Sequence, residues 1–181
     1  MTTQTQSDIE HNTQLLFQAS SKGDIDEIKR LIPISDPKSE QWGALQVVAS
    51  EGYIDCVKLL IPVSDPKANN SAALLYASEH GYTEIVQLLI PVSDPKANDS
   101  RALRAAVEND HINAIKLLIP VSDYTLVMQK LLNNNNIYTQ YDTTVFQQCI
   151  DEYEALQQKN HLQDTIDGVV ENKLHLVKRK M

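Results

Sequence analysis

Residues whose side chains could do chemistry are few in this chain of 181 residues, and they lie far apart. Cys56 and Cys149 are the candidate nucleophiles, but neither has a general base close to it in the sequence. The five histidines include no pair at i and i+4, the spacing that places two metal ligands on one helix face. The five glycines form no phosphate-binding loop. We therefore expect a protein that is not an enzyme and that holds no cofactor and no metal ion.

The charge of the chain argues against nucleic acid as a partner. Its 24 acidic and 16 basic residues give a net charge of −8, whereas nucleic-acid binding draws most of its affinity from a basic surface. The N-terminal stretch is polar, and no apolar run reaches the length that spans a membrane. We expect a cytoplasmic protein that binds neither nucleic acid nor membranes and is a monomer in the free state. Its acidic balance is compatible with a basic partner.

A repeat of 29 residues organises most of the chain. The string LIPVSDPKAN occurs at residues 60–69 and 89–98, and related strings begin at Leu31 and Leu118. One unit of this length cannot bury its own apolar face, so such units stack on one another. After a flexible N-terminus of residues 1–11, we expect repeats over residues 12–123, divided into 12–35, 36–64, 65–93 and 94–123.

Each repeat has the pattern of a short helix followed by a second helix. In the third copy Leu74, Ala77 and Gly81 share one face of the first helix, and the glycine ends this helix because a left-handed backbone costs glycine little. In the fourth copy Asp110 stands at the glycine position, so it must adopt the same left-handed conformation.

Polar residues and prolines mark the ends of these helices. The first helices are expected to take N-caps from hydroxyl side chains, namely Thr13, Ser71 and Ser100. The second helices should stop before prolines, which disfavour the helical conformation in the preceding residue: Pro33, Pro62, Pro91 and Pro120. The turn Ser-Asp-Pro-Lys follows, and we expect its aspartate to cap its own loop.

The third copy resembles the ankyrin repeat. Residues 74–89 read LLYASEHGYTEIVQLL, and the family pattern is Leu-x-x-Ala-Ala-x-x-Gly-His-x-Glu-Val-Val-x-Leu-Leu. The resemblance implies an all-α protein, an α-solenoid of about four helix-turn-helix repeats. The period here is shorter than the usual 33 residues, and Pro-Val-Ser-Asp-Pro-Lys replaces the Gly-Ala-Asp finger of the family. We therefore expect helical stacking without binding through hairpin tips.

The C-terminal segment, residues 124–181, does not follow the repeat in sequence. Its patterns predict three helices, at about 124–132, 143–158 (with Asp142 as N-cap) and 164–177. Because a solenoid needs a terminal element with a polar outer face, we expect this segment to be a helical cap. A separate partner-binding module and an unrecognised enzyme activity in this segment are the alternatives.

The resemblance also implies a function, since ankyrin relatives commonly bind proteins on the concave face formed by their first helices. Residues 65–93 and 94–122 share 16 of 29 residues, and stacking does not explain why they differ on this face. We expect a non-catalytic protein-binding module. The alternative is an acidic inhibitor or immunity-type protein that blocks a basic enzyme or toxin. The candidate partner-binding residues are Trp42, Gln46, Leu75, Tyr76, Glu79, His80, Arg101, Arg104 and Glu108.

Overall fold

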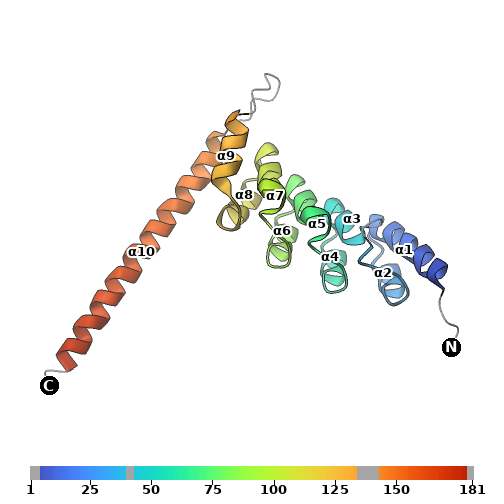
Figure 1. Cartoon of the computed structure of the whole chain (residues 1–181), viewed down its shortest axis with the longest axis horizontal. Coiled ribbons are helices and arrows are strands. Elements are labelled where there is room, and N and C mark those ends of the chain that lie inside the picture. Colours follow the sequence, from blue (N-terminus) through green and yellow to red (C-terminus); the bar gives the residue numbers. More distant parts are fainter. Residues whose placement is uncertain (1–4, 40–42, 134–142, 179–181) are drawn as a thin grey trace.

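The protein is a row of helix pairs, seen in the computed structural model of Figure 1, which describes residues 5–39, 43–133 and 143–178. The described residues form helices and turns and contain no strand. The first helices of the pairs form one layer: α1 (Gln6–Ser21), α3 (Ala44–Glu51), α5 (Ala68–Glu79) and α7 (Ala97–Glu108). The second helices form the other layer: α2 (Ile25–Leu31), α4 (Ile54–Leu60), α6 (Thr83–Leu89) and α8 (Ile112–Leu118). The predicted all-α solenoid of about four repeats is confirmed.

The interior consists of apolar columns that recur with the period of the sequence. Each first helix contributes one leucine, and all four leucines are buried: Leu16, Leu45, Leu74 and Leu103. Each second helix contributes two aliphatic residues, again buried: Ile28 and Leu31, Val57 and Leu60, Val86 and Leu89, Ile115 and Leu118. Burying one such side chain contributes about 1.5–3 kcal/mol, so these columns are what holds neighbouring repeats together.

The ends of the first helices are left-handed, as predicted. Gly81 has a φ of 71°, and Asp110 at the equivalent position has a φ of 56°. An additional left-handed turn, which the sequence did not reveal, precedes the right-handed part of α5 and α7. Its φ values are 52°, 58° and 60° at Asn69, Asn70 and Ser71, and 49°, 59° and 57° at Asn98, Asp99 and Ser100. Asn and Asp tolerate this conformation better than most residues do.

The prediction that hydroxyl residues cap the first helices is wrong. Helix α1 begins at Gln6, within the stretch that was expected to be flexible, and its cap is Thr5, which forms a capping box with Asp8. Thr13 lies inside α1. The three hydroxyls instead accept the backbone N–H of the aspartate in the following loop: Thr13 from Asp36 at 2.8 Å, Ser71 from Asp94 at 2.8 Å, and Ser100 from Asp123 at 2.9 Å. They fasten the loop after a repeat to the start of that repeat.

The loops between repeats are ordered by their prolines and aspartates. The second helices end two residues before each proline, but the residue before the proline stays helical, with φ −45° and ψ −51° at Ile32. Proline therefore stops the α-helix here because it lacks an N–H, and it enters a 3₁₀ turn such as Ile32–Ile34. The expected aspartate caps are confirmed: Asp36, Asp65 and Asp94 accept the N–H of the lysine two residues later at 3.0–3.1 Å.

The C-terminal segment continues the two layers of the solenoid. Helix α9 (Tyr124–Asn133) packs on α7, and the first turns of helix α10 (Thr144–Lys178) pack on α8, so the pair occupies the place of a fifth repeat. Two separate helices were predicted where α10 is a single helix, because its one glycine lowers helix stability by only about 1 kcal/mol. The proposed cap residue Asp142 lies outside the described residues.

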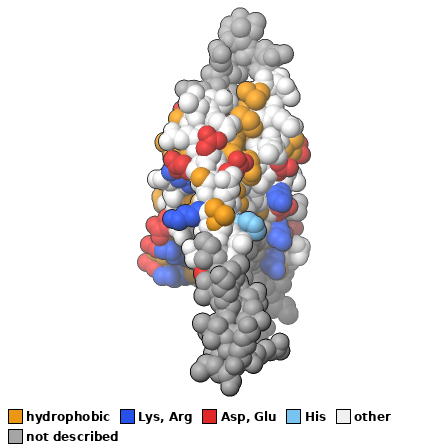
Figure 2. Space-filling model, turned by 90° about the vertical axis from the view of Figure 1, so that its left-hand side faces the viewer, with side chains coloured by type: hydrophobic (Ala, Val, Ile, Leu, Met, Phe, Trp, Pro, Cys, Tyr) orange, Lys and Arg blue, Asp and Glu red, His pale blue; other side chains and the backbone are white. Residues whose placement is uncertain are grey.

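Of the α10 side chains that the structure describes, only those near the start of the helix are buried. Phe146, Cys149 and Ile150 are buried, whereas every residue from 154 to 165 is exposed. Beyond its contact with α8 the helix projects away from the stack (Figure 1). The face of the molecule in Figure 2 carries hydrophobic side chains in its middle, with acidic side chains among them, and further charged side chains on both sides. The solenoid is thus closed by α9 and by the first turns of α10.

Candidate functional site

Two hollows that contain predicted site residues lie on the exposed face of the first helices. The first, here called the α3 hollow, has a volume of about 440 Å³ and lies over α3 between α1 and α5. It is lined by Phe17, Gly43, Gln46, Val47, Ser50, Tyr76, Glu79 and His80. Four of the predicted site residues meet here, namely Gln46, Tyr76, Glu79 and His80. Phe17, Gly43 and Ser50 were expected on the same face of the first helices but were not among the predicted binding residues, and Val47 was not predicted.

The α3 hollow combines apolar walls with a polar rim. Phe17 and Val47 are half-buried, and the side chain of Tyr76 is 37% exposed. His80 is held in place on one side by a 2.9 Å hydrogen bond between its Nδ1 and the carbonyl oxygen of Tyr76, in which Nδ1–H is the donor. On the other side its ring stacks on Tyr82, with centroids 5.8 Å apart. The hollow therefore suits an apolar side chain from another molecule, and the polar groups on its rim can form hydrogen bonds with the backbone around that side chain.

The second hollow, here called the α9 hollow, lies between α7 and α9. Its volume is about 620 Å³, and it is lined by Arg101, Arg104, Glu108, Leu126, Gln129, Lys130, Leu131 and Asn133. The predicted residues Arg101, Arg104 and Glu108 meet here. The α9 residues were not predicted, because the sequence of α9 does not repeat. The one available signal was the loop before it, since LIPVSD at residues 118–123 also precedes the first helices of the other repeats.

Charged groups in the α9 hollow are partly paired. The Nε of Arg104 lies 3.7 Å from Oε1 of Glu108 on the same helix. The ammonium of Lys130 donates a hydrogen bond to Asp99, which lies in the left-handed turn at the start of α7. Seven of the nine predicted residues thus form two groups rather than one patch. Leu75 is half-buried and lines neither of these hollows, and Trp42 lies outside the described residues.

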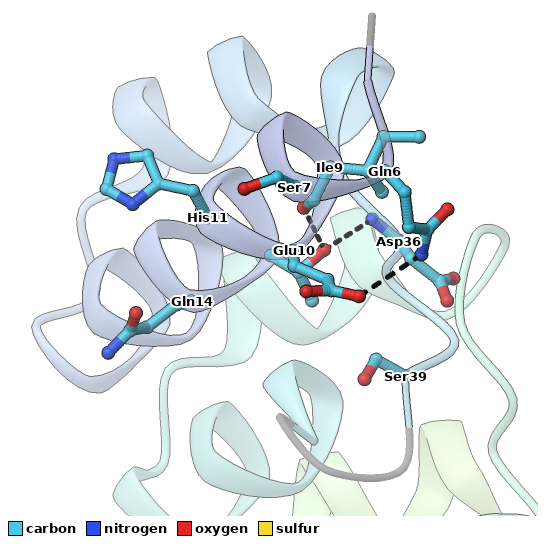
Figure 3. A pocket seen from close by; sticks show the side chains of 9 residues that line it. Gln6, Ser7, Ile9, Glu10, His11, Gln14, Asp36 and Ser39 are labelled. Carbon is cyan, nitrogen blue, oxygen red and sulfur yellow. Dashed lines mark hydrogen bonds between the residues drawn. The ribbon is translucent and has the colours of Figure 1, made fainter.

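A third hollow, of about 490 Å³, lies at the N-terminal end of the stack (Figure 3). Its polar groups largely bond to one another. Gln6 donates to Glu10 at 3.4 Å, and Thr13 donates to the carbonyl oxygen of Ile9 at 2.7 Å. His11 points away from Asp36, so the hollow does not present a convergent set of ligands. Within residues 5–39, 43–133 and 143–178, no group of three or more His, Cys, Asp or Glu residues could hold a metal ion.

Both cysteine thiols are buried. Burial raises the pKa of the Cys56 thiol, and the nearby Asp55 and Asp24 raise it further. Burial also raises the pKa of Cys149, partly offset by Lys116. A raised pKa keeps a thiol protonated, whereas a nucleophilic cysteine needs a lowered one. Among the helices that the structure describes, none combines the length and the apolar character that crossing a membrane requires.

Comparison with known proteins agrees with the architecture. A family model described as ankyrin repeats (3 copies) matches residues 16–99 and 64–130, which together include α3 to α8 and most of α9. No curated protein matches the chain. The match extends over more than half of the sequence, and the helix pairs in the structure follow the same repeats. The chain therefore belongs to the ankyrin repeat family, whose repeats are generally protein–protein interaction modules.

Proposed function

We propose that this protein is a non-catalytic binding module that docks a partner protein on the exposed face of its first helices, the concave face of the ankyrin family. The α3 hollow carries the proposal. It presents an exposed tyrosine, Tyr76, beside the half-buried Phe17 and Val47. Tyrosine is a frequent anchor of protein interfaces, because it buries a large area with few rotatable bonds.

The rigidity of the stack supports this function. Hydrogen bonds such as that from Asp94 to Ser71, at 2.8 Å, join three of the loops to the repeats before them. The side chain of Ser93 also donates to the carbonyl oxygen of Pro66 in the previous loop, at 3.3 Å. A surface that is ordered before binding loses little conformational entropy when it engages a partner, so more of the contact energy appears as affinity.

Site-specific photo-crosslinking in cells that express the protein tests the proposed surface. A benzophenone amino acid at Gln46, in the α3 hollow, should crosslink to a partner, and the added change Tyr76→Ala should weaken this crosslink at least fivefold. The matched control places the same group at Gln87, which is exposed on α6 in the layer of the second helices. If the crosslink forms at Gln87 and not at Gln46, the first-helix face is not the binding surface.

An inhibitor of a basic enzyme is the second candidate function, favoured by the net charge of −8. Its acidic surface would be the first turns of the second helices, where Asp26, Asp55 and Glu84 are exposed. Lysines partly neutralise this row: Lys58 lies 3.9 Å from Asp55 and 3.6 Å from Glu84. The geometry therefore supports this candidate less well. The triple change Asp26→Asn, Asp55→Asn and Glu84→Gln would abolish binding to a basic partner and leave docking on the first helices intact.

A further inference from the structure

The α9 hollow contains a local excess of positive charge in an acidic protein. Arg101 and Arg104 lie three residues apart on α7, and Lys130 reaches the same hollow from α9. Glu108 is the one carboxylate among the lining residues. The chain as a whole carries a charge of −8, so this concentration of cations does not follow from its composition.

Lys130 is paired with Asp99, but the two arginines are incompletely satisfied by the protein itself. Within the described part of the chain, Arg101 is exposed and makes no ion pair. The side chain of Arg104 is only 20% exposed, yet its carboxylate neighbour Glu108 stays 3.7 Å from Nε. A guanidinium offers five N–H donors, and leaving them unpaired in a partly buried place is unfavourable. A carboxylate from another molecule would satisfy two of them at once.

The stacking of the repeats does not require these side chains. At the position of Arg101 the three earlier repeats have Gln14, Gly43 and Ala72. At the position of Arg104 they have Phe17, Gln46 and Leu75. Neutral residues thus serve the same structural position elsewhere, and the cations are confined to the end of the stack next to α9.

The surroundings of the cations favour a peptide over nucleic acid. Leu126 and Leu131 of α9 supply apolar surface, which suits the aliphatic part of a glutamate side chain. The lining contains no aromatic ring on which a base could stack. From these observations we infer that the α9 hollow receives an acidic segment of the partner protein. The inference rests on the proposed function.

The separation of the two hollows defines the partner further. Neighbouring helices in a layer pack about 8–10 Å apart. The α3 hollow is centred on α3, and the α9 hollow lies between α7 and α9, two to three helix steps away. The separation is then about 16–30 Å, the length of roughly five to nine residues of extended chain. The partner segment carries an apolar side chain for the α3 hollow and carboxylates about five to nine residues away.

Synthetic peptides and the full-length protein test this inference by NMR titration, which detects weak binding. The probe has one leucine, seven glycine and serine residues, and three glutamates. It should shift the amide signals of α7 and α9, and replacing the glutamates by glutamines should weaken binding at least tenfold. The double change Arg101→Gln and Arg104→Gln should have an equal effect. The control change Lys38→Gln and Lys67→Gln, which removes the same charge from the loops, should weaken binding less than twofold.

Three results would overturn the inference. The first is that the amide signals of α7 and α9 do not shift when the glutamate probe is added. The second is that the lysine control loses as much binding as the arginine double change. The third is a single-stranded oligothymidylate that binds the same residues as tightly as the peptide. Photo-crosslinking at Gln46 separates this inference from the proposed function. If Tyr76→Ala weakens the crosslink but the arginine change does not, docking on the first helices stands and the acidic segment is excluded. If the crosslink fails at Gln46, the proposed function fails too.

Discussion

The imidazole ring of His111 lies against Gly81 of the preceding repeat, so closely that a Cβ added to Gly81 would stand 2.5 Å from Nδ1. The same contact recurs along the stack, with Tyr82 against Gly52 and Tyr53 against Gly23. The other ring nitrogen of His111, Nε2, lies 2.9 Å from the carbonyl oxygen of Glu79. The glycine at this position therefore has two roles, since it ends its own helix and leaves room for a ring of the next repeat.

The change Gly81→Ala should destabilise the protein by about 1–3 kcal/mol. The new Cβ would clash with His111, and alanine would be strained in the left-handed conformation of this position. Urea unfolding followed by circular dichroism measures the loss. Gly43→Ala is the matched control. Its new Cβ would meet the flexible side chain of Gln46 and its φ is negative, so a change below about 1 kcal/mol is expected. Equal losses would show that the ring contact has no energetic weight.

The change Asp110→Gly should raise stability by about 0.5–1 kcal/mol. Asp110 holds a φ of 56° at the position where the other repeats have glycine, and a left-handed backbone costs a residue with a side chain about 1–2 kcal/mol. Part of this gain is lost, because glycine has more freedom in the unfolded chain. Thermal unfolding monitored by calorimetry provides the measurement. A lower melting temperature in the variant would contradict this account of the fourth repeat.

Inward and outward residues of the third repeat should respond very differently to truncation. Leu74 is fully buried, so Leu74→Ala should cost about 2–5 kcal/mol. Lys67 is exposed, and its hydrogen bond to Asp65 uses the backbone N–H, so Lys67→Ala should change stability by less than about 0.5 kcal/mol. Chemical denaturation of both variants checks the contrast.

Truncations should separate the closing part of the C-terminal segment from the projecting part. A chain that ends after Asn160 keeps Phe146, Cys149 and Ile150, and it should melt within about 2 °C of the full chain. A chain that ends after Ser122 uncovers Leu118 and Ile119, which are buried in the full protein. That chain should melt far lower. Equal melting temperatures for these two chains would show that α9 and the start of α10 do not cap the stack.

The contact between α8 and α10 should depend on pH through Lys116 and Glu152, whose charged groups lie 2.7 Å apart. The hydrogen bond from Lys116 lowers the pKa of Glu152, and the same bond raises the pKa of Lys116. A lowered carboxyl pKa stabilises the fold above the unfolded value of about 4.3 and loses this effect as the pH falls through the folded pKa. The raised pKa of Lys116 stabilises the fold below the unfolded value of about 10.4, and this stabilisation is lost as the pH rises through the folded pKa.

Glu152→Gln should therefore lower the melting temperature at pH 7 and should no longer differ from the wild type near pH 3. The effect is small, because both side chains are exposed. Asp151→Asn on the same turn is the control, since its carboxylate contacts Gln147 of its own helix. A difference between Glu152→Gln and the wild type that persists unchanged at pH 3 would exclude the ion pair as its cause.

The repeated part of the fold could be predicted because each of its features occurs several times. Leu74, Ala77 and Gly81 each have counterparts in the other copies, so their helix, its buried face and its left-handed end were all predictable. The left-handed turn at Asn69 was not predictable, because Asn-Asn-Ser fits several turn types and its conformation depends on the loop contact of Ser71. The unbroken α10 was predictable, since no proline interrupts it, and the prediction of two helices gave its one glycine too much weight.

The candidate site was predictable in part: seven of the nine predicted residues line the two hollows, but their division into two groups was not predicted. The repeat period placed Gln46, Tyr76, Arg101 and Arg104 on the exposed side of the first helices, where the structure has them. The division into two hollows depends on which neighbours each residue meets. Lys130 joins the two arginines only because α9 takes the place of a fifth first helix, and the sequence of α9 has no counterpart in the other repeats.

The contacts between neighbouring loops have a consequence for how such a chain changes its length. The bonds from Asp94 to Ser71 and from Ser93 to Pro66 join residues 23 and 27 positions apart, and each has an equivalent one repeat later. A tandem duplication of residues 65–93 would therefore supply every donor with an acceptor again. The two ends of the molecule would move apart by one step of about 8–10 Å. The length of this protein therefore changes in steps of one repeat. A gene that gains one copy of the repeat encodes a longer stack that needs no new kind of contact between repeats.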